Sequence, residues 1–163
     1  MRPVLLEPRL VDAVREHLAE LLAAAKRAGC RLLLPEDHVV AQAIEETSPA
    51  RVVDTIPDGW MGLDIGPRTA ARYAAAAGRA ATLLWNGPMG VFEMEKFSHG
   101  SFDLARAVAN LDATTVVGGG ETAAVVALAG LQSRFTHVST GGGASLEMLE
   151  GRELPGVAAL LDA

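Results

Sequence analysis

Residues 114–126 read TTVVGGGETAAVV, and this stretch decides the fold class because its physical character changes twice. Thr114–Val117 is short, apolar and β-branched, as in a buried strand, whereas Glu121–Leu128 is alanine-rich, as in a helix. The intervening Gly118–Gly120 predicts a turn in which unpaired helical N–H groups face outward with no Cβ beside them. Such a turn suits phosphate. The alternative is a tight turn that needs positive φ, which one or two glycines would satisfy.

The same arrangement is repeated at the next predicted strand end. Phe135–Val138 reads as a strand, and STGGGAS at residues 139–145 leads from it into a short helix at Ala144–Leu149. Two glycine-opened helix N-termini side by side suit a ligand that carries several phosphates. A further strand, Thr82–Trp85, runs into NGPMG at residues 86–90, which is too broken for a regular element. Because ligands collect at the carboxyl ends of parallel strands, we expect the binding site there.

The rest of the chain alternates between helical and extended patterns. The predicted elements are an amphipathic helix at Pro8–Ala28 ended by Gly29, strands at Arg31–Leu34, Arg51–Val53 and Leu63–Ile65, a helix from Pro67 to about Ala77 ended by Gly78, and a helix at Ser101–Leu111 with Ser101 as N-cap. Strands that alternate with helices predict an α/β fold with a parallel sheet. No repeat or linker divides the 163 residues, so we expect one domain.

The composition and charge of the chain argue against some classes of binding partner. The net charge is −6, and the 14 basic residues are spread thinly, which argues against binding to nucleic acid or to an acidic membrane surface. The single Cys30 suits a reducing compartment, and no apolar run approaches the ~20 residues of a membrane span. We therefore expect a cytoplasmic protein. The four histidines show no metal-ligand spacing, and solvation or core hydrogen bonding is the simpler role for all of them.

Four motifs, taken in order along the chain, resemble phosphoglycerate kinase. They are WMGLDIGP at residues 60–67, WNGPMGVFE at 85–93, VVGGGET at 116–122 and HVSTGGGASLEMLEG at 137–151. The resemblance implies a Rossmann-like α/β/α domain that binds a nucleotide, in a glycolytic kinase that moves a phosphoryl group between bisphosphoglycerate and ADP with Mg²⁺. From the residues alone, the loop at 86–93 is either a groove wall or a rigid loop with a solvated Glu93.

The resemblance also implies roles for individual residues. Gly62, Asn86, Pro88 and Val91 would line the adenosine site, with Glu93 on the ribose, and Gly119, Gly120, Glu121 and Thr122 would hold the phosphates. The backbone N–H groups of Gly119 and Gly120, with a weaker contribution from Gly142 and Gly143, would stabilise the transferring phosphoryl group. The family usually has Asp where this chain has Glu121, whose extra methylene moves the carboxylate outward from a Mg²⁺ position.

Other parts of the family pattern have no counterpart in these residues. Missing are the substrate-binding N-terminal domain, the lysine-bearing segment that opens the nucleotide domain and the glycine-rich strand end after it, so residues 1–163 resemble a partial nucleotide-binding domain. In the strand order 3-2-1-4-5-6 implied by the resemblance, two central strands are lacking, and we expect exposed sheet edges that favour self-association. We expect a chain that is inactive alone. The alternatives are a residual nucleotide-binding module and a truncated product that needs a complementing chain.

Overall fold

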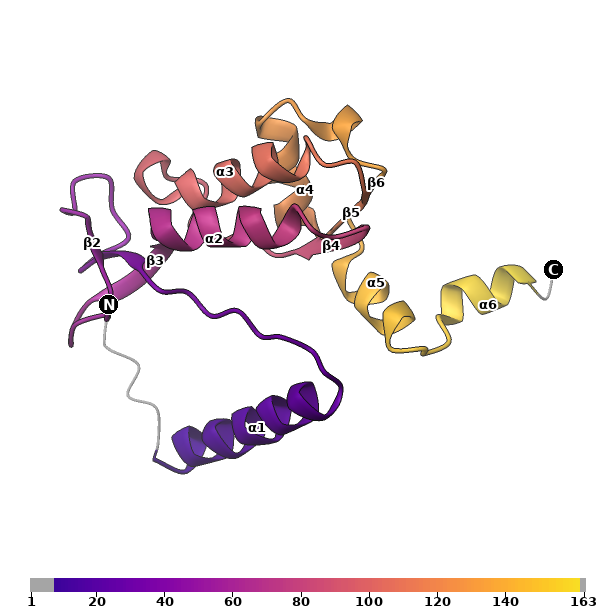
Figure 1. Cartoon of the computed structure of the whole chain (residues 1–163), viewed down its shortest axis with the longest axis horizontal. Helices are drawn as coiled ribbons and strands as arrows, with labels where there is room; N and C mark the ends of the chain where they lie inside the picture. Colours follow the sequence, from indigo (N-terminus) through magenta and orange to yellow (C-terminus); the bar gives the residue numbers. More distant parts are fainter. Residues whose placement is uncertain (1–7, 162–163) are drawn as a thin grey trace. The chain divides into compact units, whose positions relative to one another are not determined.

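A computed structural model of the chain describes residues 8–161, and the chain forms two compact units with the boundary between Leu34 and Pro35 (Figure 1). In the first unit, helix α1 spans Pro8–Arg27, and Gly29 follows it with φ of 66°. The predicted helix and its glycine stop are therefore confirmed. The left-handed conformation at Gly29 explains the glycine, because other residues adopt it only at a steric cost.

The predicted strand at Arg31–Leu34 is wrong, because the structure assigns these residues to no strand. A strand is defined by its ladder with a neighbouring strand, and the six strands of the described chain do not include this segment. The segment is also rich in leucine rather than in the β-branched residues that favour strands. Leu32 and Leu34 remain 44% and 66% exposed. Apolar content alone therefore led to the wrong assignment.

The parallel sheet predicted for the glycine-rich region is present in the second unit (Figure 1). It consists of β4 (Thr82–Asn86), β5 (Thr114–Gly118) and β6 (His137–Ser139), in the order β4-β5-β6. Helices α3 (His99–Val108) and α4 (Gly120–Leu128) lie on one side of it in Figure 1, and α5 (Gly142–Leu149) lies on the other. The α/β class is confirmed. The core between the sheet and its helices includes Trp85, Leu104, Ala105, Val108, Val117, Val125, Val126 and Phe135.

A second, antiparallel sheet was not predicted. It consists of β1 (His38–Ala41), β2 (Arg51–Val53) and β3 (Met61–Ile65), in the order β2-β1-β3. The predicted strands at 51–53 and 63–65 are thus confirmed, but they pair through β1 rather than joining the parallel sheet. The register shifts between Val39 and Val40, which marks an irregularity of the β-bulge type.

The helix predicted from Pro67 is confirmed as α2 (Pro67–Ala77), with Gly78 as its C-cap. The predicted N-cap of α3 is wrong: the helix begins at His99 with Ser98 as its N-cap. Ser101 is fully buried within the first turn, where its Oγ accepts a hydrogen bond of 2.9 Å from the backbone N–H of Met89. Remaining elements are the 3₁₀ turns η1 (Glu95–Phe97) and η2 (Gln132–Arg134) and helix α6 (Pro155–Leu161).

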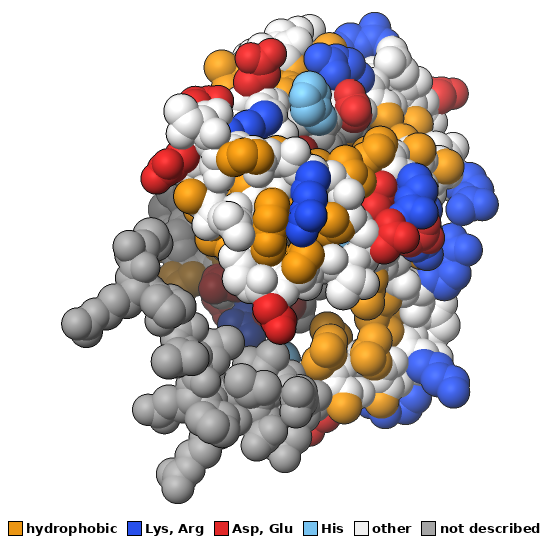
Figure 2. Space-filling model, turned by 90° about the vertical axis from the view of Figure 1, so that its left-hand side faces the viewer, with side chains coloured by type: hydrophobic (Ala, Val, Ile, Leu, Met, Phe, Trp, Pro, Cys, Tyr) orange, Lys and Arg blue, Asp and Glu red, His pale blue; other side chains and the backbone are white. Residues whose placement is uncertain are grey.

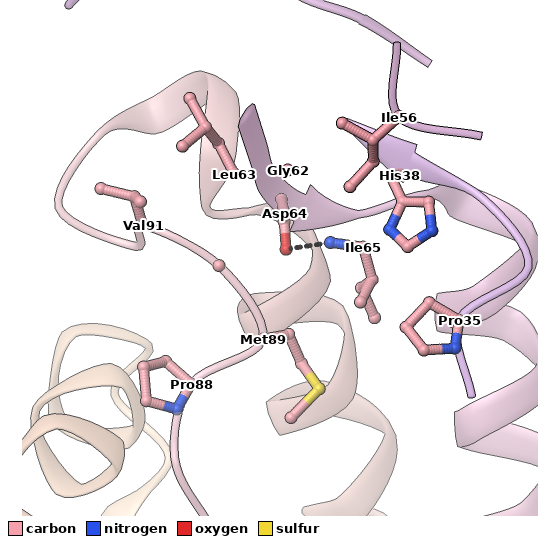
Figure 3. Close-up of a pocket in the computed structure, with 11 residues that line it drawn as sticks. Pro35, His38, Ile56, Gly62, Leu63, Asp64, Ile65, Pro88, Met89 and Val91 are labelled. Carbon is pink, nitrogen blue, oxygen red and sulfur yellow. Dashed lines mark hydrogen bonds between the residues drawn. The ribbon is translucent and has the colours of Figure 1, made fainter. Parts of the chain in front are cut away.

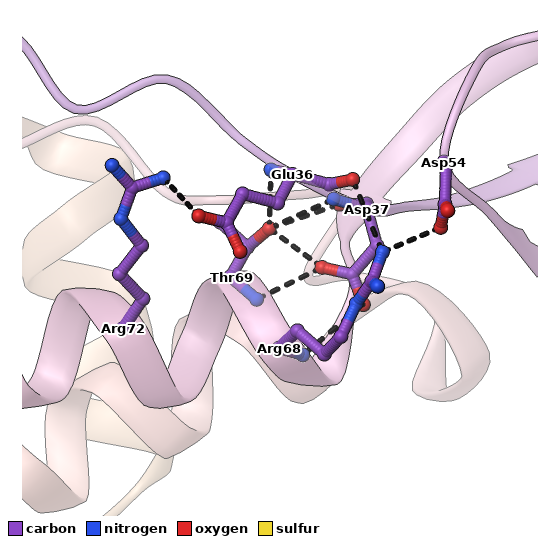
Figure 4. Close-up of polar contacts among 6 residues, drawn as sticks. All are labelled: Glu36, Asp37, Asp54, Arg68, Thr69 and Arg72. Atoms are coloured by element: carbon purple, nitrogen blue, oxygen red, sulfur yellow. Dashed lines mark hydrogen bonds and ion pairs between the residues drawn. The ribbon is translucent and has the colours of Figure 1, made fainter.

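A buried carboxylate joins α2 to the residues that precede β1 (Figure 4). Asp37 accepts hydrogen bonds from the backbone N–H groups of Arg68 (3.1 Å) and Thr69 (2.8 Å) and from Thr69 Oγ1 (2.6 Å). Gly66, the N-cap of α2, has no side chain to cap the helix, so Asp37 performs this role from outside. Burial tends to raise the pKa of Asp37, but the hydrogen bonds from Thr69 and Arg68 outweigh it and lower that pKa.

Charged side chains of both signs are distributed among hydrophobic ones on the face drawn in Figure 2. Among the described side chains, Arg68, Arg72, Arg106 and Arg152 each form an exposed or partly exposed ion pair with an acidic neighbour. None of the helices in the described part of the chain has the length and apolar character that a membrane span requires.

Candidate functional site

The carboxyl ends of the three parallel strands stop at the same level. Asn86 at the end of β4 is in register with Gly118 at the end of β5, and Gly118 is in register with Ser139 at the end of β6. The segments that follow are the glycine-rich loops singled out in the sequence. The register therefore places three loops side by side at one edge of the sheet, as expected for a parallel α/β site.

Two of these loops touch through their backbones. The N–H of Gly119 donates a hydrogen bond of 3.0 Å to the carbonyl of Ser139, and Gly119 has φ of 94°, which favours glycine. A Cβ added to Gly142 would lie 2.8 Å from the Cα of Gly119, so only a glycine allows the approach. These two glycines are needed for packing. By contrast, a Cβ on Gly120 or Gly143 would meet nothing within 4 Å, so these glycines leave open space beside the backbone.

Two side chains connect the glycine loops to the end of β4. The Asn86 amide donates from Nδ2 to the carbonyl of Gly142 at 3.4 Å. Thr122, which is 1% exposed, accepts a hydrogen bond of 2.7 Å at its Oγ1 from the backbone N–H of Gly87. The hydroxyl proton of Thr122 remains available for donation to another acceptor. Asn86 and Thr122 thus hold the three loops together, which the sequence patterns did not indicate.

Helices α4 and α5 both begin at this edge of the sheet. Their N-cap residues, Gly119 and Gly141, supply no side-chain acceptor to the first turn. The first N–H groups of an α-helix have no partner within the helix, and they carry the positive end of its dipole. Two helix starts with glycine caps, held together by the contact between Gly119 and Gly142, therefore form a surface of backbone donors suited to an anion.

A pocket of about 360 Å³ opens beside β3 (Figure 3). Three of the four residues expected around adenosine, Gly62, Pro88 and Val91, lie in its lining, and Asn86 does not. The lining residues are Pro35, His38, Ile56, Gly62, Leu63, Asp64, Ile65, Pro88, Met89, Gly90 and Val91. The pocket is therefore built from the start of β1, the loop before β3, β3 itself and the loop after β4. A single loop, residues 86–91, connects it with the glycine-rich strand ends.

Backbone contacts fix the two walls of this pocket. The N–H of Val91 donates to the carbonyl of Leu63 at 2.9 Å, which holds the loop against β3. A Cβ on Gly62 would lie 2.8 Å from Ile56 Cδ1, so the glycine allows Ile56 to close over β3. A Cβ on Gly90 would lie 2.5 Å from the Asp64 carboxylate. The glycines at positions 62 and 90 are therefore explained by close packing of the walls.

Asp64 is a buried carboxylate in the pocket lining, and sequence reasoning missed it. Its Oδ2 accepts from the N–H of Gly100 at 2.8 Å, in the first turn of α3, and its Oδ1 accepts from the N–H of Ile65 at 2.8 Å. Burial raises its pKa, against the lowering effect of these hydrogen bonds and of the nearby His99. His38 is also in the lining, although its spacing in the sequence gave no indication of a site.

The two acidic residues expected at the site are both exposed. Glu93 lies outside the pocket lining, and Glu121 lies in the first turn of α4. No group of three or more metal-ligating side chains occurs among the side chains that the structure describes. Mg²⁺ is commonly held by one or two carboxylates together with substrate phosphates, and Glu121 beside the glycine loop fits only that mode.

Comparison with known proteins identifies the family. A family model described as phosphoglycerate kinase matches residues 5–152 of the 163. The chain belongs to the phosphoglycerate kinase family. Curated phosphoglycerate kinases from Moorella thermoacetica and Clostridium novyi are 54% and 52% identical to it over 156 and 149 residues. These alignments cover 94% and 90% of the chain but only 40% and 37% of those proteins.

Solved structures of phosphoglycerate kinases give the same result. The Coxiella burnetii enzyme matches with a TM-score of 0.78 and 40% identity, over 90% of this chain and 38% of that one. The Pyrococcus horikoshii enzyme matches with a TM-score of 0.75 and 34% identity, over 93% and 37%. The chain thus has a phosphoglycerate kinase fold over about two-fifths of the length of these relatives, which confirms the family resemblance and the partial coverage seen in the motifs.

Proposed function

We propose that residues 1–163 form the nucleotide-binding part of a phosphoglycerate kinase and bind ADP or ATP at the carboxyl edge of the parallel sheet. The observation that carries this proposal is the contact between Gly119 and Gly142, which joins two glycine-capped helix starts at aligned strand ends. Phosphates would lie against the backbone N–H groups of Gly120, Gly142 and Gly143. The N–H of Gly119, which was expected to take part, already donates to the carbonyl of Ser139. Phosphoryl transfer depends on such positioned donors, because charge accumulates on the equatorial oxygens.

The nucleoside would lie in the pocket beside β3. Gly62, Pro88 and Val91 line it, and Asn86 lies two residues from Pro88 along the chain, or at most about 7 Å. One ligand can therefore extend from the pocket to the glycine loops along residues 86–91. Thr122 would donate its remaining hydroxyl proton to a phosphate oxygen while it accepts from Gly87. Glu93 would accept from a ribose hydroxyl only if the exposed side chain turned toward the ligand.

Magnesium, when bound with the nucleotide, would neutralise charge on the phosphates. Glu121 is the carboxylate of this chain that would hold it, with the phosphates supplying further oxygen ligands. Bisphosphoglycerate would bind to the part of the relatives that residues 1–163 do not span. We therefore infer that these residues bind nucleotide without transferring phosphate, and that the whole family enzyme works in cytoplasmic glycolysis.

The test is calorimetry of the 163-residue chain with Mg-ADP, adenosine and pyrophosphate. Gly120→Val should weaken ADP and pyrophosphate at least tenfold and leave adenosine unchanged, because the new side chain projects into the open space beside the backbone. Gly156→Val in α6 is the matched control, since that position is equally open. Equal ADP affinity in Gly120→Val and the unmodified chain would refute the glycine-loop site.

A coupled assay for ATP formation tests the second part of the proposal. The chain should show no turnover with bisphosphoglycerate and Mg-ADP. Turnover that rises in proportion to protein concentration and disappears in Gly120→Val would refute the claim that these residues do not transfer phosphate.

A further inference from the structure

The loop between β1 and β2, residues 42–50, is folded around a single ammonium group. Lys96, in the turn η1, donates from its Nζ to the main-chain carbonyls of Glu45, Glu46 (2.6 Å) and Ser48 (2.8 Å). A lysine ammonium has three N–H donors and no acceptor, so three carbonyls use its whole hydrogen-bonding capacity. The number of acceptors that the loop offers therefore matches one primary ammonium.

Backbone contacts within the loop shape the turn that carries these carbonyls. The N–H of Ser48 donates to the carbonyl of Glu45 at 3.1 Å, which closes a β-turn. The N–H of Ala43 donates to Ser48 Oγ at 3.3 Å. Pro49 follows, and a proline favours an extended conformation in the residue before it. Local contacts thus close the loop, whereas three of its carbonyl oxygens converge on the ammonium.

An aromatic ring adds to the environment of the ammonium. The Nζ of Lys96 lies 5.1 Å from the centroid of the Phe97 ring, within the range of a cation–π interaction. Phe97 is fully buried and forms a hydrophobic cluster with Ala41 and Leu63. Leu63 also lines the pocket beside β3. The ammonium therefore joins the loop to the turn that packs behind one wall of this pocket.

We propose that the β1–β2 loop is a binding site for a primary ammonium ion, which the side chain of Lys96 occupies. The chemistry of the acceptors selects this class of ion. Mg²⁺ is usually held by carboxylates or phosphates, whereas these three acceptors are uncharged carbonyls. A guanidinium is planar and spreads its N–H groups over separate nitrogens, and a quaternary ammonium has no N–H to donate. This inference does not depend on nucleotide binding.

An added amine tests the site in Lys96→Ala, because n-propylammonium replaces the atoms that this variant lacks beyond Cβ. Hydrogen exchange of the Ala43 and Ser48 amides should be about tenfold faster in the variant than in the unmodified chain. It should slow again, by mass action, as n-propylammonium is added at constant ionic strength. Tetramethylammonium carries the same charge without N–H groups and should have no such effect.

Lys26→Ala is the matched control variant, because Lys26 is exposed on α1 and lies outside the loop. It should leave the exchange of both amides unchanged. The proposal would be overturned if Lys96→Ala did not accelerate exchange, if n-propylammonium did not slow it, or if tetramethylammonium slowed it equally well.

The two lysines of the chain, Lys26 and Lys96, allow a second test within one molecule. An acetylating ester reacts with an amine nitrogen only after this nitrogen has left its hydrogen-bond acceptors. Mass spectrometry of peptides should therefore find Lys96 modified about tenfold more slowly than Lys26 in the folded chain, and at the same rate in urea. Equal rates in the folded chain would show that the ammonium leaves the loop freely, and would contradict the proposed site.

Discussion

The two sheets of the second unit position their loops by different means. At the end of the parallel sheet, the glycine loops are held mainly by backbone contact, with Gly119 at φ of 94° and Gly142 against it. At the antiparallel sheet, two buried carboxylates are the anchors: Asp37 caps α2 and Asp64 caps α3. The stability of the backbone-held end, at the parallel sheet, should therefore be sensitive to added side-chain atoms. The stability of the carboxylate-held end, at the antiparallel sheet, should be sensitive to loss of charge and to pH.

The two carboxylates also differ from each other. Asp37 accepts hydrogen bonds from Arg68 and from both the backbone and the hydroxyl of Thr69, and its pKa is lowered in spite of burial. Asp64 accepts from two backbone N–H groups, and burial outweighs them, so its pKa is raised. The balance between burial, on one side, and the hydrogen-bond donors and nearby charges, on the other, thus decides which form of each carboxylate the fold stabilises.

The largest expected effect is that of Asp37→Ala. The change leaves the backbone N–H groups of Arg68 and Thr69, in the first turn of α2, without their acceptor. The Thr69 hydroxyl can still donate to the main-chain carbonyl of residue 37, at 3.2 Å. Each buried donor left unsatisfied costs about 1–3 kcal/mol, so we expect a loss of about 3 kcal/mol or more in the free energy of unfolding. Urea denaturation followed by far-UV circular dichroism measures it.

Asp54→Ala is the control for this change. Asp54 also pairs with Arg68, but its side chain is 76% exposed, and exposed pairs contribute less than about 1 kcal/mol. Equal losses in the two variants would mean that the Arg68 ion pairs, rather than the cap on α2, stabilise this region.

The next largest effect is expected at the glycine loops. Gly142→Ala places a Cβ 2.8 Å from the Cα of Gly119, and the loops must separate to accommodate it. We expect a loss of about 1–3 kcal/mol in the free energy of unfolding. Gly143→Ala, at the next position of α5, meets nothing within 4 Å and should stabilise the chain by up to about 1 kcal/mol. If both changes had the same effect, the contact between the two loops would not be important for stability.

The sequence predicted the glycine-held end well because its constraints are local. The β-branched run at Thr114–Val117, three glycines and an alanine-rich helix specify a strand, a turn and a helix without reference to distant residues. The structure has them at β5 and α4, with boundaries shifted by one residue at each side of the turn. The alignment of three strand ends followed from the α/β pattern as well.

The carboxylate-held end could not be predicted because its contacts are distant in sequence. Asp37 and Thr69 are separated by 32 residues, and Asp64 and Gly100 by 36. Nothing in the local pattern of either aspartate distinguishes a buried cap from a solvated side chain. The antiparallel sheet was missed because its central strand, β1, is only four residues long and was not predicted, although β2 and β3 on either side of it were. His38 is the first residue of β1, so its position in the pocket lining was not predicted either.

A smaller effect is expected where a side chain assists the backbone-held end. Thr122→Val removes the acceptor of the Gly87 N–H while keeping the shape of the side chain, and should cost about 1–2 kcal/mol. Thr122→Ser keeps the hydroxyl and should restore most of the difference. Hydrogen exchange of the Gly87 amide is the direct measurement: it should accelerate in Thr122→Val and remain close to the unmodified rate in Thr122→Ser. Unchanged exchange in Thr122→Val would show that this hydrogen bond does not hold the loop.

The smallest effect is a difference in pH dependence, and it separates the two ends by the shape of the stability curve. A lowered pKa means that Asp37 contributes stability above the ordinary aspartate range, which is lost as pH falls through its folded pKa. A raised pKa gives Asp64 the opposite effect on stability: its protonated form stabilises the fold in acid, and this contribution is lost as pH rises through its folded pKa.

The free energy of unfolding, measured from about pH 3 to pH 7, tests this difference. It should fall less in acid for Asp37→Asn than for the unmodified chain, and it should fall more for Asp64→Asn. Gly142→Ala should shift the whole curve without changing its shape, because no titrating group takes part in that contact. If Gly142→Ala changed how the free energy of unfolding falls at low pH, the two ends would be coupled through the loop at residues 86–91.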